Sequence, residues 1–204
     1  MADVKKVALK DQFSMMVILL IPIAIAINVV GGTLGSALHL PVDLDMIGVI
    51  LVGFLTGPIP ACITGVLTNL INGIFDPSWI PYAFVSFFIG ISSGLLGKYG
   101  MATKLWKLIV SGLIIAIIAT VTSAPITVFF FGGATGGGAS MIAAGLMAAG
   151  QEIMTAVLST YIVTESIGKI ISVFVAWIII KAIPSRTLMK YRFGSLYVKD
   201  ADAE

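Results

Sequence analysis

The sequence predicts an all-α integral membrane protein with six transmembrane helices and with both termini in the cytoplasm. The 204-residue chain is 58% hydrophobic and only 11% charged, and its mean hydropathy is +1.09. Soluble domains are typically about 45–50% apolar and about 25% charged. This chain has too little polar surface to cover a globule in water. We expect one membrane domain over residues 1–204, with a membrane-embedded core at 12–186 and a cytoplasmic tail at 187–204.

The first apolar segment, residues 13–30, follows the short polar sequence Met-Ala-Asp-Val-Lys-Lys. Its length of about twenty residues matches a transmembrane helix. It is too long for the core of a signal peptide, so we expect it to be retained. The next two segments, 46–54 and 59–71, are separated by Gly57, Pro58 and Pro60, which favour a turn. Four further apolar segments follow, at 80–96, 105–131, 141–162 and 167–183.

Basic residues set the expected number of crossings. Eleven of the twelve lie in three clusters, which precede the first segment, separate the fourth from the fifth, and follow the last. Lysine and arginine collect in cytoplasmic loops. Even numbers of crossings between clusters require a split at Gly57-Pro58 and only two crossings after Lys107. We therefore expect residues 132–164 to form a helical lid or re-entrant segment on the outer side. Gln151 and Glu152, in the middle of this segment, would be costly against lipid.

Enzyme motifs are nearly absent. The stretch from Gly94 to Lys98 lacks the spacing and the hydroxyl of a phosphate-binding loop. His39 is the only histidine, so a two-histidine metal site is excluded and a serine-hydrolase triad is unconvincing. We predict no enzyme activity, no metal and no cofactor in this chain. Cys62, the single cysteine, has no partner for an internal disulfide.

Polar and aromatic residues gather where the predicted helices reach the outer face. Amides both donate and accept hydrogen bonds, and an ionisable residue within a span indicates function. Each feature also has a structural interpretation: helix capping, an interfacial aromatic belt, a kink at Pro125, or an i,i+4 pair between Glu165 and Lys169. We expect an interruption of the fifth span around Pro125, and we interpret Asp43 and Asp45 as solvated loop residues. The predicted substrate-binding residues are Asn69, Asn72, Trp79, Tyr82, Ser123, Thr127, Gln151, Glu152 and Lys169.

Small residues along the first span form a second group. The pair Gly31 and Gly35 matches the small-x-x-x-small pattern of closely packed membrane helices. Such a surface can pack internally or dock a partner protein, and the pattern does not distinguish these. The predicted docking residues are Ala24, Ala26, Asn28, Gly31 and Gly35.

An ordered set of motifs resembles the S component, the substrate-binding membrane subunit, of energy-coupling factor (ECF) vitamin transporters. The resemblance covers roughly residues 21–184. Its most specific parts are the run from Leu40 to Gly48, the turn at Gly57-Pro58, Gly65-x-x-x-Asn69-x-x-Asn72-Gly73, Ser123-Ala124-Pro125, and the glycine-rich stretch 131–136. In that family an alanine often recurs four residues apart in the first span. Here Ala24 is followed at that spacing by Asn28.

The resemblance implies a subunit of a bacterial plasma-membrane importer that captures a vitamin or precursor outside. It would work with an EcfT-type transmembrane coupling protein and two EcfA-type ATPases, which bind the ATP, and would topple in the membrane. The subgroup looks closest to those for hydroxymethylpyrimidine or pyridoxine, with pantothenate and cobalamin left open. The alternatives are a self-sufficient secondary transporter or channel driven by an ion gradient, and a structural or assembly protein.

Overall fold

The computed structural model describes residues 13–198, and every regular element in this range is a helix. The expected all-α fold is therefore confirmed for the described part of the chain. Lys5, Lys6, Lys10 and Lys199 lie outside it. Four helices are long and apolar enough to cross a membrane: α1 (Met15–Ala37), α3 (Pro58–Phe75), α5 (Leu105–Phe131) and α7 (Ile153–Ala182).

Three further apolar helices are shorter: α2 (Ile47–Thr56), α4 (Ala83–Lys98) and α6 (Gly138–Ala148). At 1.5 Å per residue, ten-residue α2 is about 15 Å long, half of the hydrocarbon thickness of a bilayer. All ten of its residues are buried, and its neighbours are α1, α3, α4 and α7. Because protein surrounds it, α2 need not match the thickness of the lipid.

The expected break between the second and third apolar segments is confirmed. Gly57 ends α2 with φ +113° and ψ −174°, and Pro58 begins α3. Essentially only glycine adopts this backbone conformation. Proline is favoured in a first helical turn, where its missing N–H has no helical partner to lose. The chain reverses here without a longer loop.

Two expected boundaries in the second half of the chain are wrong. The helix break lies at 149–152, where Gly150 has φ +96°, and Gln151 and Glu152 occupy this exposed turn rather than the middle of a helix. Residues 153–164 belong to α7, which continues through Glu165. Polar residues did not end this helix because Glu165 is paired with Lys169 on the same helix. An extra helix between α5 and α7 does exist, but it is the eleven-residue α6.

The expected interruption of the fifth span is also absent, because α5 is continuous through Pro125. Membrane helices tolerate proline when neighbouring groups satisfy the freed backbone. Beyond α7, the segment predicted as a tail folds back onto the bundle. It contains α8 (Ser185–Leu188) and η3 (Gly194–Tyr197), and the Phe193 N–H donates to the Leu55 carbonyl at 3.0 Å. Leu188, Tyr191 and Tyr197 belong to the main hydrophobic core.

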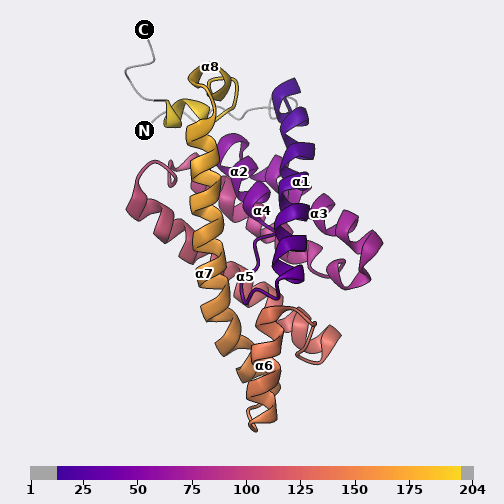
Figure 1. The fold of residues 1–204 in the computed structure, drawn as a ribbon. Helices are drawn as coiled ribbons and strands as arrows, with labels where there is room; N and C mark the ends of the chain where they lie inside the picture. The colour runs from indigo at the N-terminus through magenta and orange to yellow at the C-terminus, as the bar shows by residue number, and fades with distance from the viewer. Residues whose placement is uncertain (1–12, 199–204) are drawn as a thin grey trace.

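The bundle has two chemically different ends. At one end, the start of α1 lies near the end of α7 and α8, while α6 lies at the opposite end (Figure 1). We call the first the basic end. Contacts there join the α2–α3 junction to the C-terminal segment, and Gly100 lies close to Leu196. The described basic residues on the elements that meet there are Lys98, Lys104, Lys107, Lys181, Arg186, Lys190 and Arg192.

Candidate ligand pocket

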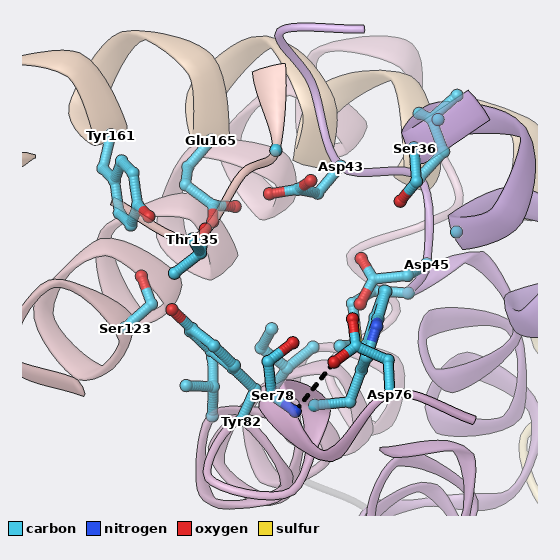
Figure 2. A pocket seen from close by; sticks show the side chains of 18 of the residues that line it. Ser36, Asp43, Asp45, Asp76, Ser78, Tyr82, Ser123, Thr135, Tyr161 and Glu165 are labelled. Carbon is cyan, nitrogen blue, oxygen red and sulfur yellow. Dashed lines mark hydrogen bonds between the residues drawn. The ribbon is translucent and has the colours of Figure 1, made fainter. Parts of the chain in front are cut away.

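The end away from the basic residues contains a cavity of about 290 Å³. Its walls come from the end of α1, the 38–46 loop, η2 (Pro77–Trp79), the start of α4, the end of α5, the loop after α5, and α7. Polar side chains from these elements converge on one space (Figure 2). The polar and aromatic residues of the lining include Asp43, Asp45, Asp76, Trp79, Tyr82, Ser123, Tyr161, Glu165 and Lys169.

Glycines bring the 42–45 backbone close to two helices. A Cβ atom at Gly31 of α1 would overlap the Leu44 carbonyl, and one at Gly32 would crowd both Asp45 and Trp79. On the other side, a Cβ at Gly168 of α7 would lie 3.1 Å from the Asp43 carbonyl oxygen. Small residues allow this close approach. The glycines of α1 therefore position the pocket loop, which explains their spacing by internal packing.

Helix α7 supplies one wall through a regular spacing. Tyr161, Glu165 and Lys169 are four residues apart, which places them on one face of the helix. All three are buried, and the Lys169 Nζ lies 2.9 Å from the Glu165 Oε2. No other ion pair is seen among residues 13–198. The expected i,i+4 pair of Glu165 and Lys169 is therefore confirmed, and Lys169 also lines the cavity.

A chain of hydrogen-bonded hydroxyl groups joins the start of α4 to α5 and α7 beside the cavity. The Tyr82 and Thr127 hydroxyls are 2.6 Å apart, and those of Thr127 and Tyr161 are 3.0 Å apart. The Tyr82 ring also stacks on Phe131, with ring centroids 5.9 Å apart and planes 7° from parallel. These contacts hold the Tyr82 and Tyr161 side chains in place at the wall of the pocket.

Three buried oxygens of cavity-lining residues have no hydrogen-bond partner in the described part of the chain: the Asp45 Oδ1, the Ser123 Oγ and the Glu165 Oε2. Of these, only the Glu165 Oε2 has an ionic partner, Lys169. Buried polar atoms are normally paired, since an unpaired one costs on the order of 1–3 kcal/mol. The Asp45 side chain points into the cavity (Figure 2), where a ligand can reach it. Asp45 is only 7% exposed, so its interpretation as a solvated loop residue is wrong.

The structure gathers four of the nine predicted substrate-binding residues at this cavity: Trp79, Tyr82, Ser123 and Lys169. Thr127 contacts it indirectly, through Tyr82 and Tyr161. The Asn69 amide donates to Ser86 and to the Gly65 carbonyl, so it joins α3 to α4 outside the lining. Asn72 is buried elsewhere, and Gln151 and Glu152 are exposed on the α6–α7 turn.

The predicted docking residues also separate. Ala24 is fully buried, and a Cβ on Gly48 of α2 would overlap its carbonyl. Asn28 is fully buried as well; it donates to the Thr68 hydroxyl at 3.0 Å and accepts from the Gly48 N–H at 2.6 Å. Gly35 lines the ligand pocket and Gly31 backs its loop. Ala26 is exposed and lies in an apolar groove between α1 and α3, beside Pro22 and Leu67.

Sequence reasoning missed Asp43, Asp45, Tyr161 and Glu165 as pocket residues. The four-residue spacing of Tyr161, Glu165 and Lys169 would have found two of them, had α7 been recognised as one helix. Nothing local distinguishes a buried Asp45 from a solvated one. Comparison of the chain with protein-family models, with curated proteins and with solved structures finds no match.

Proposed function

We propose that this chain is the substrate-capturing membrane subunit of an ECF-type, ATP-driven importer. It would bind a small water-soluble vitamin or vitamin precursor at the outer face of a bacterial plasma membrane. An EcfT-type coupling protein and two EcfA-type ATPases would complete the transporter. The single observation that best supports this is a cavity of about 290 Å³ at one end of a mainly apolar helical bundle, with carboxylates, hydroxyls and aromatic rings in its lining.

The charge distribution supports an orientation for this proposal. The basic end would face the cytoplasm under the positive-inside rule, which places the pocket on the outer side. In this arrangement α2 and α4 complete six crossings with the four long helices, and both termini are cytoplasmic. The 132–137 loop, three of whose residues line the cavity, and α6 would form its outer cover.

Uptake measurements test the proposal directly. We expect vitamin uptake into proteoliposomes only when the chain is reconstituted with a coupling protein and two ATPases and supplied with ATP. Native mass spectrometry of the purified chain, expressed in rich medium, should reveal a co-purifying molecule of vitamin mass. Uptake by the chain alone would contradict the proposal.

One observation favours a second candidate, a secondary transporter. Glu165 and Lys169 form a buried ion pair within α7, and ionisable residues in a span often belong to proton pathways. This alternative predicts uptake without partners that a protonophore abolishes. The uptake experiment therefore separates the two candidates: the ECF-type importer requires the ATPases, and the secondary transporter requires a proton gradient.

The docking surface is tested separately. We expect Ala26→Trp to fill the groove between α1 and α3 and to abolish ATP-driven uptake while ligand binding persists. Ile178→Trp, at a 58% exposed position on α7, is the matched control and should leave uptake unchanged. Ala24→Trp does not test docking, because its side chain would collide with α2 inside the bundle. Unimpaired uptake in Ala26→Trp would show that the partner binds elsewhere.

A further inference from the structure

The pocket has a strong excess of acidic residues. Five acidic residues occur in the described range, and four of them line this one cavity: Asp43, Asp45, Asp76 and Glu165. Of the eight basic residues in the same range, the cavity receives only Lys169. An apolar protein with so few charges has therefore concentrated carboxylates at the site where a ligand would bind.

Lys169 does not balance these charges. Its Nζ is 2.9 Å from Glu165, which accounts for one carboxylate. The Asp76 Oδ1 accepts the Ser78 N–H at 3.0 Å, a neutral contact that leaves its charge in place. The structure shows no ion pair for Asp43 or Asp45 among residues 13–198, although Lys169 is near enough to Asp45 to lower its pKa. With all these groups ionised, the lining has an excess of three negative charges over the Glu165–Lys169 pair.

Among the acidic residues of the pocket, Asp45 is the buried carboxylate that lacks a partner within the described range. Asp45 is only 7% exposed, and its Oδ1 has no hydrogen-bond partner there. Its side chain points into the cavity. Figure 2 shows Asp43 and Glu165 facing the same space from another side. A buried carboxylate is costly unless it is paired, so the missing partner is expected to come from the ligand.

The cavity suits an organic cation rather than a metal ion. No three histidine, cysteine or carboxylate side chains within residues 13–198 are grouped to hold a metal. Trp79, Tyr82 and Tyr161 line the same space, and aromatic faces attract ammonium groups. The volume of about 290 Å³ is near the lower end of small-molecule sites, which begin at about 300 Å³. A single-ring molecule matches this size.

We propose that the pocket selects a small ring compound that has a protonated amine, and that Asp45 binds the ammonium group with Asp43 at the rim. This narrows the ligand class and rests on the proposed function, since it assumes that the cavity is the capture site. The ring would lie against Trp79 and Tyr82, and the Ser123 hydroxyl would supply a neutral hydrogen bond.

The protonation of Asp45 is consistent with this assignment. Burial raises the pKa of the Asp45 carboxyl above its ordinary value, and the nearby Lys169 only partly offsets the effect. An entering ammonium group favours the ionised carboxylate, which would release a proton. Calorimetry in buffers of different ionisation enthalpy would detect that proton.

Matched ligand pairs test the selection. Pyridoxamine and pyridoxine differ at one position by an ammonium group in place of a hydroxyl. The aminomethyl and hydroxymethyl forms of the aminopyrimidine make a second pair. We expect titration calorimetry of the purified full chain to give at least about tenfold tighter binding of one amine over its hydroxyl partner, or about 1.4 kcal/mol.

Variants locate the effect. Asp45→Asn should weaken amine binding about tenfold or more and should weaken binding of the hydroxyl partner much less, so that the preference for the amine is lost, whereas Asp45→Glu should retain the preference. Melting temperature reports whether each variant folds. If Asp45→Asn does not fold, Asp43→Asn at the exposed rim serves instead, with a smaller expected loss.

Equal or tighter binding of the hydroxyl compounds would overturn the inference, and so would the absence of amine binding at about 1 mM. These failures are distinguishable from failure of the proposed function. A neutral or anionic ligand taken up with the ATPases would leave the proposed function standing. Amine-selective binding without ATPase-dependent uptake would leave the inference standing.

Discussion

At the scale of single residues, burial decides which polar groups define the site. Asp43 and Asp45 are two residues apart in one loop, yet Asp43 is exposed and Asp45 is 7% exposed. The difference arises because the loop passes between α1 and α7, where Gly32 leaves room for the Asp45 side chain. Asn69, which looks equally suited to a ligand in the sequence, is instead used between α3 and α4.

The protonation of Asp45 makes stability depend on pH. Burial raises its pKa above the ordinary 3.8, so the folded chain retains a proton that the unfolded chain releases. This contribution to stability is fully present below about pH 3.8 and is lost as the pH rises toward the folded pKa. Asp45→Asn removes the loss. Between the pKa of the unfolded chain and that of the folded chain, we expect the free energy of unfolding of the variant to rise relative to the wild type by on the order of 1 kcal/mol for each pH unit.

The measurement is a series of melting temperatures in detergent from pH 4 to pH 8, without ligand, for both proteins. Ser78→Ala provides a control for a change in the pocket lining that does not titrate, and its difference from the wild type should not vary with pH. A constant difference between wild type and Asp45→Asn would show that Asp45 does not titrate in this range.

At the scale of elements, the short helix α2 creates space for the pocket. In the proposed membrane arrangement, a helix of about 15 Å matches only half of a layer of about 30 Å, and the non-helical 38–46 loop leads into it. Irregular backbone at membrane depth is tolerated where it is buried in protein or lines a cavity. Residues 43–46 of this loop line the cavity, and Asp45 lies two residues before the start of α2.

The junction of α2 and α3 depends on the backbone of Gly57. We expect Gly57→Ala to destabilise the fold by about 1–3 kcal/mol, because φ +113° is strained for a residue with a Cβ atom. Thermal unfolding in detergent measures the loss. Gly145→Ala is the matched control, since nothing lies within 4 Å of a Cβ there and alanine favours the helix. Equal melting temperatures for the two variants would contradict the expectation.

At the scale of the whole molecule, charges separate along the bundle. Seven basic residues lie on elements of the basic end, and four carboxylates surround the pocket at the other end. The interior between them is filled mainly by α2 and by apolar residues of α1, α4, α5 and α7. This separation allows one end to face the cytoplasm and the other to face the outside.

Cysteine labelling tests that orientation. In a Cys62→Ser background, we expect a membrane-impermeant maleimide to label Ala134→Cys, in the exposed loop after α5, in intact cells. Met189→Cys, 65% exposed at the basic end, should react only after the membrane is permeabilised. Ala119→Cys, which is fully buried, is the control and should remain unlabelled. Labelling of both exposed positions in intact cells would contradict the arrangement.

The sequence by itself determined the helical membrane class, the break at Gly57-Pro58 and part of the pocket, including Trp79, Tyr82 and Lys169. These follow from composition, from backbone restrictions and from the rarity of ionisable groups in apolar segments, all of which are local properties. Only the tertiary structure decided that α7 continues through Glu165, that Ala24 and Asn28 face inward, and that Asp45 is buried. The last two outcomes depend on which elements meet: a loop carboxylate is buried where the loop packs against distant helices, and a small residue is hidden where another backbone packs against it.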